Sequence, residues 1–389
     1  MYKVKTFNNI AEVGLQQFDR QKFEVGEALE GADAILLRSH KLSTDEIGEN
    51  VKAIGRAGAG VNNVPVQWCT EQGIPVFNAP GANANAVKEL VLAGLLLGSR
   101  GIFQGMRYVD TLAGLDDADE MNSRLEKEKK SFKGSELIGK TLGVVGLGAI
   151  GSQVANMALG IGMKVVGYDP AISIEAAWRL SSSVSKMDSL EALLARSDYI
   201  TLHLPVLDAT RNLINAERLA GTKAGAKLLN FARAEIVDSD AIVASLDSGH
   251  LGAYIADFPK PGLIGHDKVI LMPHIGASTE EAEENCAVMA ASQLVDYLEN
   301  GNIVNSVNFP QLALERSSGH RLAICNRNIK NMLGSITSIL AEHDINVIDL
   351  LNKSRDDIAY NLIDVETLPS DAVIAQLREI DGIVNVRLV

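Results

Sequence analysis

The feature that most constrains this chain is the glycine pattern Gly146-Leu147-Gly148-Ala149-Ile150-Gly151, which directly follows the apolar run Thr141–Val145. A helix-forming stretch, SQVANMALG, comes next, and a second apolar run then ends at Asp169. In such a pattern the first two glycines permit a tight turn and close approach of the backbone to a pyrophosphate, and the third permits close helix–strand packing. The order of strand, glycine loop, helix and acidic strand end predicts a dinucleotide-binding βαβ unit.

Asp169 also bears on which dinucleotide binds. A carboxylate at this position accepts hydrogen bonds from the adenine-ribose hydroxyls and repels a 2′-phosphate. Pro170 and Ala171 follow it, so no neighbouring arginine is present to hold that phosphate. The sequence therefore favours NAD over NADP. The cofactor-binding residues that this motif predicts are Gly146, Gly148, Ala149, Ile150, Gly151 and Asp169.

The rest of the chain falls into blocks with different alternation. Short apolar runs alternate with helical stretches in residues 33–80 and again after the glycine motif, which indicates two parallel α/β sheets. Thr279 begins a capped helix of about six turns that returns to the first sheet, and the last block has the order βαββαβ. The predicted fold is α/β, with a discontinuous flavodoxin-like substrate domain, a doubly wound Rossmann domain and a ferredoxin-like C-terminal domain. The expected boundaries are 1–98 with 283–305 (substrate), 99–282 (NAD), 306–319 (linker) and 320–389 (C-terminal).

Charge and cysteine content exclude several classes of function. The net charge is -13, and the densest basic run, residues 126–130, is mixed in sign and typical of a solvated surface, so we expect no nucleic-acid partner. The 3 cysteines lack CxxC spacing, which disfavours a disulfide framework and a zinc site, so no metal is expected. Without a signal-like N-terminus or a long uninterrupted apolar segment, we expect a cytoplasmic protein with no membrane partner.

Several further runs resemble those of the D-2-hydroxyacid dehydrogenase family. They include RSHKL, GRAGAGVNNV, HLPVLDATRNLI, NFARAEIVD and PHIGAST, within a similarity that extends from Asp33 to about Pro310. The C-terminal βαββαβ block is similar to an ACT domain. The resemblance implies an NAD-dependent oxidoreductase that acts on a small 2-hydroxy acid. The apolar stretch Lys88–Leu97 and the ACT-like block favour a homodimer or homotetramer over a monomer.

The expected chemistry follows from two of these runs. Arg233 can grip a substrate carboxylate with its planar fork, and His274 can take the hydroxyl proton because its pKa lies near neutrality. Two purely structural interpretations stay open. Arg233 could form a structural ion pair, and His274 could be a buried histidine with its hydrogen bonds satisfied. The family's glutamate that pairs with the histidine is absent, since Lys260 stands before the proline. Asp257, at a strand end, is the predicted catalytic partner, whereas Asp267 lies in a GHDK turn typical of a surface.

The resemblance implies further contacts by position. The expected substrate-binding residues are Arg38 as a phosphate anchor, Ser39, Asn83, Lys129 and Lys130. Additional cofactor contacts are expected at His203, Pro205, Thr210, Phe231, Ala232 and Gly276. In the ACT-like block, Asn326 and Asn346 match effector-binding asparagines. Lys330-Asn331 occupies the place of a Pro-Gly turn, which favours weak or absent inhibition by L-serine and a role in assembly.

Among substrates, the phosphate anchor and the ACT-like block favour oxidation of 3-phospho-D-glycerate to 3-phosphohydroxypyruvate, the first step of L-serine synthesis. Two alternatives remain at this point. One is another D-2-hydroxyacid dehydrogenase, such as a hydroxypyruvate or glyoxylate reductase. The other is an NAD-sensing regulatory protein, which the intact Arg233 and His274 pair disfavours.

Overall fold

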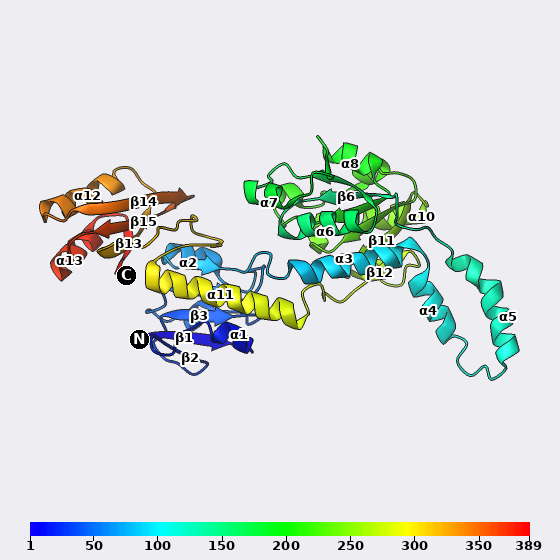
Figure 1. The fold of residues 1–389 in the computed structure, drawn as a ribbon, viewed down its shortest axis with the longest axis horizontal. Helices are drawn as coiled ribbons and strands as arrows, with labels where there is room; N and C mark the ends of the chain where they lie inside the picture. Colours follow the sequence, from blue (N-terminus) through cyan, green and yellow to red (C-terminus); the bar gives the residue numbers. More distant parts are fainter. The chain divides into compact units, whose positions relative to one another are not determined.

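The chain forms two compact units in the computed structural model, which describes the backbone of residues 1–389 and every side chain except that of Glu175. The first unit comprises residues 1–83 and 280–389, and the second comprises residues 84–279. Figure 1 shows the first unit in blue and yellow to red and the second in cyan and green. None of the helices in the described chain is both long and apolar enough to cross a membrane.

The first unit begins with a parallel sheet in the order β2-β1-β3-β4-β5, which confirms the predicted flavodoxin-like arrangement. The strands are β1 (Tyr2–Phe7), β2 (Phe23–Gly26), β3 (Ala34–Leu37), β4 (Ala53–Arg56) and β5 (Val76–Phe77). Its helices are α1 (Glu12–Leu15), η1 (Thr44–Glu46), α2 (Val66–Glu71) and α11 (Glu280–Asn300). Helix α11 packs closely against β4 at Gly55. A Cβ at this position would approach the Leu294 side chain to 2.9 Å, so only glycine leaves enough room.

The C-terminal part of this unit is an antiparallel sheet in the order β14-β15-β13-β16. This is the predicted ferredoxin-like βαββαβ fold, and α12 and α13 cover one face of the sheet through a cluster that includes Ile324, Ile336 and Leu377. The elements are β13 (His320–Arg327), α12 (Met332–Glu342), β14 (Val347–Arg355), β15 (Ile358–Val365), α13 (Asp371–Glu379) and β16 (Ile383–Leu388).

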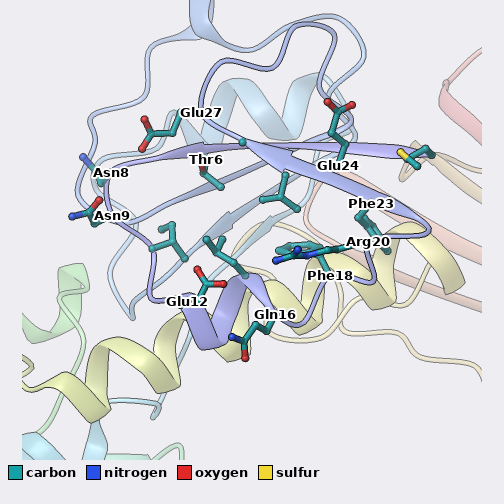
Figure 2. Close-up of a pocket in the computed structure, with 15 residues that line it drawn as sticks. Thr6, Asn8, Asn9, Glu12, Gln16, Phe18, Arg20, Phe23, Glu24 and Glu27 are labelled. Carbon is teal, nitrogen blue, oxygen red and sulfur yellow. The ribbon is translucent and has the colours of Figure 1, made fainter.

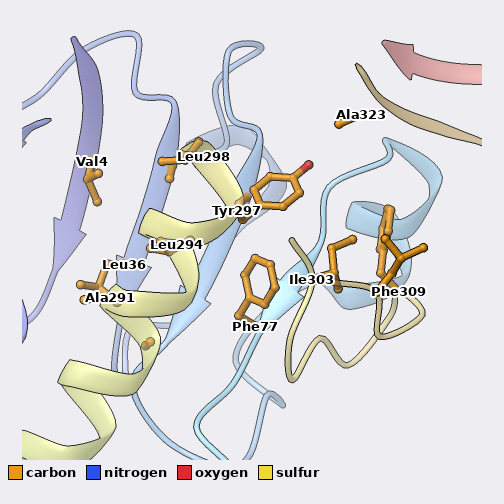
Figure 3. Close-up of a cluster of buried hydrophobic side chains, with 14 of the residues drawn as sticks. Val4, Leu36, Phe77, Ala291, Leu294, Tyr297, Leu298, Ile303, Phe309 and Ala323 are labelled. Atoms are coloured by element: carbon orange, nitrogen blue, oxygen red, sulfur yellow. The ribbon is translucent and has the colours of Figure 1, made fainter. Parts of the chain in front are cut away.

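The other face of the antiparallel sheet shares a hydrophobic core with the parallel sheet (Figure 3). Tyr360 on β15 lies tilted against Tyr297 of α11 with 6.5 Å between ring centroids, and its hydroxyl donates to Gly301 O at 2.8 Å. Residues 306–319, expected as a linker, are held here too, since Val307 N donates to Val76 O at 2.9 Å and Phe309 is buried. The C-terminal domain is therefore packed onto the substrate domain rather than tethered to it.

Two arginines of the C-terminal domain bind the end of α11. Arg321 forms a buried bidentate pair with Asp364, at 2.6 Å and 2.8 Å, and also donates to Asn300 O at 3.1 Å. Arg387 lies over the Tyr297 ring at 4.5 Å and donates to Leu298 O at 3.2 Å. Cations suit the last carbonyls of a helix, where the macrodipole is negative.

The second unit holds seven parallel strands in the order β12-β11-β10-β9-β6-β7-β8, the doubly wound arrangement that the glycine motif predicts. The strands are β6 (Thr141–Val145), β7 (Lys164–Tyr168), β8 (Ser185–Lys186), β9 (Tyr199–Leu202), β10 (Ala226–Asn230), β11 (Leu251–Ala256) and β12 (Val269–Leu271). The α-helices are α3 (Ala84–Ser99), α4 (Ile102–Asp110), α5 (Ala118–Glu128), α6 (Ala149–Gly160), α7 (Ile174–Arg179), α8 (Leu190–Arg196), α9 (Ala216–Ala220) and α10 (Ser239–Asp247). Short 3₁₀ turns are η2 (Lys129–Phe132), η3 (Asp208–Thr210), η4 (Ala234–Ile236) and η5 (Pro261–Leu263).

The division between the units differs from the expected domain boundaries, 98/99 and 282/283. It falls at Asn83/Ala84 and Thr279/Glu280. The physical reason is the packing of α3, where a Cβ at Gly94 would approach the Phe231 ring to 2.9 Å. This helix therefore belongs to the core of the second unit, and α4 and α5 extend from its end away from the sheet (Figure 1).

Candidate active site

The glycine loop of the second unit has the geometry of a dinucleotide site. Gly146 has φ 89°, and a Cβ there would approach His203 O to 2.4 Å. A Cβ at Gly151 would lie 1.9 Å from Gly146 O, so the helix can approach the loop only without a side chain at this position. By contrast, a Cβ at Gly148 would meet nothing within 4 Å, which leaves open space at the start of α6. That space is where a pyrophosphate meets the helix N-terminus.

Asp169 lies at the end of β7 and points its carboxylate at this loop. One oxygen accepts from Leu147 N at 2.8 Å and the other from Ala171 N at 2.9 Å. The carboxylate is thereby fixed beside the glycine turn while both oxygens keep further lone pairs for ribose hydroxyls. The loop, the helix start and this acceptor together fit a dinucleotide.

The other expected cofactor residues line the carboxyl ends of β9 and β10 or follow β12. His203 pairs with Thr201 Oγ1 at 2.9 Å through Nε2, and burial lowers the pKa of its ring to about 3, so the ring is neutral. Thr210 donates to Pro205 O at 2.7 Å and stabilises that turn. The remaining three, Phe231, Ala232 and Gly276, are buried.

Arg233 and His274 come together around one aromatic ring. The Arg233 guanidinium carbon lies 5.5 Å from the centroid of the Phe258 ring, and the His274 ring centroid lies 4.7 Å from it. Arg233 Nη1 also donates to Ala232 O at 2.7 Å. Asn230 supports the turn, since its amide donates to Arg233 O at 2.8 Å. A cation and an acid–base group thus lie beside the same aromatic ring.

Asp257 holds the backbone around His274 rather than its imidazole. Its backbone oxygen accepts from His274 N at 3.0 Å, and its carboxylate oxygens accept from Ile275 N at 2.8 Å and Gly276 N at 2.7 Å. His274 has φ 59°, an uncommon left-handed conformation for a non-glycine residue. Three successive amides anchored on one buried aspartate keep that conformation in place. Asp267, the alternative, is exposed, in keeping with the surface position its turn predicts.

The two lysines expected to supplement phosphate binding lie elsewhere in the second unit. Lys129 and Lys130 begin η2 beyond α5, and Lys129 pairs with Glu126 of α5 on an exposed surface. Neither has a contact with Arg233 or His274 among the hydrogen bonds and ion pairs of the described residues.

In the first unit, Arg38 follows β3 and forms an ion pair with Glu283 in the first turn of α11. Ser39 N donates to Asn8 Oδ1 at 3.1 Å, which orients the loop after Arg38. The amide oxygen of Asn83 is buried without a hydrogen-bond partner among the described residues, so it keeps an acceptor for a ligand hydroxyl.

Sequence reasoning missed Arg56, the last residue of β4. Leu37, which precedes Arg38, is the register partner of Arg56 on the neighbouring strand. Arg56 therefore ends β4 and Arg38 directly follows β3, so both lie at the carboxyl edge of the sheet, where ligands bind in open α/β sheets. The signal was present in GRAGAG, since a charged residue at the end of an apolar strand and before glycines marks that edge.

Comparison with known proteins supports this geometry. Residues 107–276 match the D-isomer specific 2-hydroxyacid dehydrogenase, NAD binding domain. The chain is 37% identical to D-3-phosphoglycerate dehydrogenase of Haemophilus influenzae over 94% of this chain and 88% of that protein. The chain belongs to the D-isomer specific 2-hydroxyacid dehydrogenase family. It is an NAD-dependent oxidoreductase of that family.

Two further relatives of this dehydrogenase show how far the likeness extends. D-3-phosphoglycerate dehydrogenase of Escherichia coli is 32% identical over 94% of this chain and 88% of that protein. The NAD+-bound 3-phosphoglycerate dehydrogenase structure from Entamoeba histolytica is 28% identical, with a TM-score of 0.61, and covers 80% of this chain and 99% of that chain. About a fifth of the dehydrogenase thus lies outside the match to that structure.

The two expected effector asparagines of the dehydrogenase have different surroundings. Asn326 is 2% exposed and accepts from Asn361 Nδ2 at 2.8 Å, within a row of asparagines across β13, β15 and β14. Asn346 is exposed. Asn331 adopts φ 71°, the conformation that a Pro-Gly turn would give to glycine.

A cavity lies in the first unit, and its lining contains none of the predicted catalytic or substrate-binding residues. It has a volume of about 570 Å³ and lies between β1, β2 and α1. Figure 2 shows its lining, which includes Thr6, Phe18, Glu12, Glu24 and Glu27. None of the described residues that line it belongs to the predicted site.

Proposed function

We propose that this dehydrogenase oxidises 3-phospho-D-glycerate to 3-phosphohydroxypyruvate, the first step of L-serine biosynthesis. The observation that carries the proposal is the shared position of Arg233 and His274 beside the Phe258 ring. A 2-hydroxy acid requires a cation for its carboxylate and a base for its hydroxyl. Support for a phosphorylated substrate comes from the neighbouring positions of Arg38 and Arg56 at the ends of adjacent strands, and from the relatives named D-3-phosphoglycerate dehydrogenase.

Each step of the proposed reaction has a residue with suitable chemistry. Arg233 binds the substrate carboxylate through its planar fork and polarises the C2 oxygen. His274 accepts the C2 hydroxyl proton during oxidation and returns it during reduction. The bound nicotinamide ring supplies the hydride acceptor. In the first unit, Arg38 and Arg56 supply positive charge for the phosphate.

The direct test is a comparison of NADH oxidation with 3-phosphohydroxypyruvate, hydroxypyruvate and glyoxylate. We expect the highest kcat/KM for the phosphorylated substrate, and His274→Ala should reduce its kcat by about 10²–10⁴-fold while NADH still binds. A higher kcat/KM for hydroxypyruvate or glyoxylate would instead favour the alternative reductase function. If none of the three is reduced while NAD binds, the protein is an NAD sensor.

Asp257 serves, in our proposal, as a positioning residue that acts through the backbone. Asp257→Asn replaces one carboxylate oxygen with a donor that opposes Ile275 N or Gly276 N, so kcat should fall about tenfold. Because the imidazole is not its partner, the apparent pKa of the kcat profile should not move. A shift of that pKa in the variant would show that the carboxylate acts on the imidazole directly.

We also propose a homodimer or homotetramer in which the ACT-like domain serves assembly. Helix α4 exposes Phe103, Met106 and Val109, of which Met106 is 64% exposed. Light scattering should therefore give a mass of at least two chains.

Because Asn326 is already satisfied within the sheet, millimolar L-serine should inhibit weakly or not at all. Micromolar inhibition by L-serine would overturn this part of the proposal.

A further inference from the structure

Arg38 and Arg56 form the cationic edge of the first sheet, and the loop beyond Arg56 is built around its guanidinium. Gly58 has φ 154°, and a Cβ there would lie 1.7 Å from Arg56 Nη1. The glycine therefore leaves the space that the guanidinium fills. With Arg38 one strand away, two positive charges stand at the edge where an anionic group of a ligand would bind.

A third charged group enters this edge from α11. Glu283 Oε1 accepts from Arg38 Nη2 in a close ion pair. The same three side chains act on Cys286, one turn further along the helix. Burial raises the pKa of the Cys286 thiol, Arg56 and Arg38 lower it, and Glu283 raises it. Both cations and the carboxylate of the Arg38–Glu283 pair therefore influence one buried thiol.

The Arg38–Glu283 pair is accessible and weakly held. Each side chain is 39% exposed, so water and solutes reach both partners. Exposed ion pairs of this kind contribute little to stability. A phosphate carries close to two negative charges and three acceptor oxygens, so it binds a guanidinium fork more strongly than one carboxylate does.

We infer that Glu283 is an internal competitor for the substrate's phosphate, which holds Arg38 until a dianionic group displaces it. The inference rests on the proposed function, since it assigns the anion at this edge to the phosphorylated end of the substrate. Glu283 thus weakens the binding of phosphorylated ligands, because they must break its ion pair and tolerate its charge. A 2-oxo acid with an uncharged hydroxymethyl end does not compete for Arg38, and Glu283 leaves its binding unchanged.

The isosteric variant Glu283→Gln tests this in the full-length enzyme. The KM for 3-phosphohydroxypyruvate should fall roughly fivefold, the fold-change that corresponds to loss of one exposed ion pair, with kcat nearly unchanged. The KM for hydroxypyruvate should stay the same. Glu284→Gln, an exposed neighbour on the same helix, is the matched control and should change neither value. A rise in KM for the phosphorylated substrate, or no change, would overturn the inference.

A binding measurement separates this inference from the proposed function. Inorganic phosphate, titrated into the protein by calorimetry, should bind roughly fivefold more tightly to Glu283→Gln than to the wild type. In an Arg38→Met background the Glu283→Gln change should have no effect, because the contested guanidinium is gone. If Glu283→Gln binds phosphate more tightly but the wild type does not reduce 3-phosphohydroxypyruvate, only the proposed function is refuted. If the wild type reduces 3-phosphohydroxypyruvate but Glu283→Gln does not change phosphate binding, only the role of Glu283 as a competitor is refuted.

Discussion

The two ends of α11 each carry an arginine–carboxylate contact, and the two contacts differ in almost every physical respect. At the C-terminal end, Arg321 and Asp364 are 0% and 3% exposed and share two hydrogen bonds. At the N-terminal end, Arg38 and Glu283 are each 39% exposed and share one. Burial makes the first pair permanent, because neither partner can leave without stranding the other. Exposure makes the second pair exchangeable, which suits a group that receives a ligand.

The largest effect should come from breaking the buried pair. Asp364→Asn leaves the Arg321 guanidinium buried without its counter-charge, which should lower the free energy of unfolding by about 3–5 kcal/mol. Urea titration followed by far-UV circular dichroism measures this. Glu283→Gln, the same kind of change at the exposed pair, should alter the free energy of unfolding by about 0.5 kcal/mol or less.

A double variant controls for failure of Asp364→Asn to fold. Arg321→Met with Asp364→Leu replaces the buried pair by apolar side chains of similar size. It should recover most of the lost stability, since buried pairs are often no better than well-packed apolar substitutes. Equal instability of the single and double variants would mean that Arg321 matters for its contacts with the end of α11 rather than for its charge.

A smaller effect is expected when the exposed pair is broken from the arginine side. Arg38→Met should raise the KM for 3-phosphohydroxypyruvate by about 10–100-fold, the loss expected for a charged hydrogen bond to phosphate. The free energy of unfolding should change little. Steady-state kinetics and urea titration on one preparation measure both quantities. If Arg38→Met lowers the free energy of unfolding as much as Asp364→Asn does, the two ion pairs do not differ in their contribution to stability.

The smallest effect should appear in how the free energy of unfolding depends on pH below about pH 4. Burial of Asp364 alone would raise its pKa, but the hydrogen bonds from Arg321 and Ser317 outweigh burial and hold the pKa below its usual value. A lowered folded-state pKa contributes stability above the unfolded value, near 4, and that stability is lost as the pH falls through the folded value. Below about pH 4 the wild type should therefore lose stability faster than the Arg321→Met/Asp364→Leu variant, as thermal melts between pH 5 and pH 2 would reveal.

The sequence predicts those parts of the molecule that depend on local patterns. The glycine loop, its helix and Asp169 lie within one short segment, so their spacing predicts both the fold and the cofactor. The contacts at the two ends of α11 join residues far apart in the chain, 245 positions for Arg38 and Glu283 and 43 for Arg321 and Asp364. No local pattern encodes such a pair. Asp257 was predicted from its strand-end position as the partner of the His274 imidazole, but its carboxylate accepts from the Ile275 and Gly276 amides, which a residue-type argument does not reveal.

The common core under the antiparallel sheet has a consequence for how this enzyme could be shortened or recombined. Tyr297, Ile303 and Phe309 are buried beneath strands β13 and β15. Truncation before β13 would uncover this aromatic and aliphatic surface and favour aggregation. The C-terminal domain therefore cannot be deleted, or transferred to another protein, as an independently folding domain. A soluble truncated protein would need polar residues in place of Tyr297, Ile303 and Phe309, because these side chains would then face water.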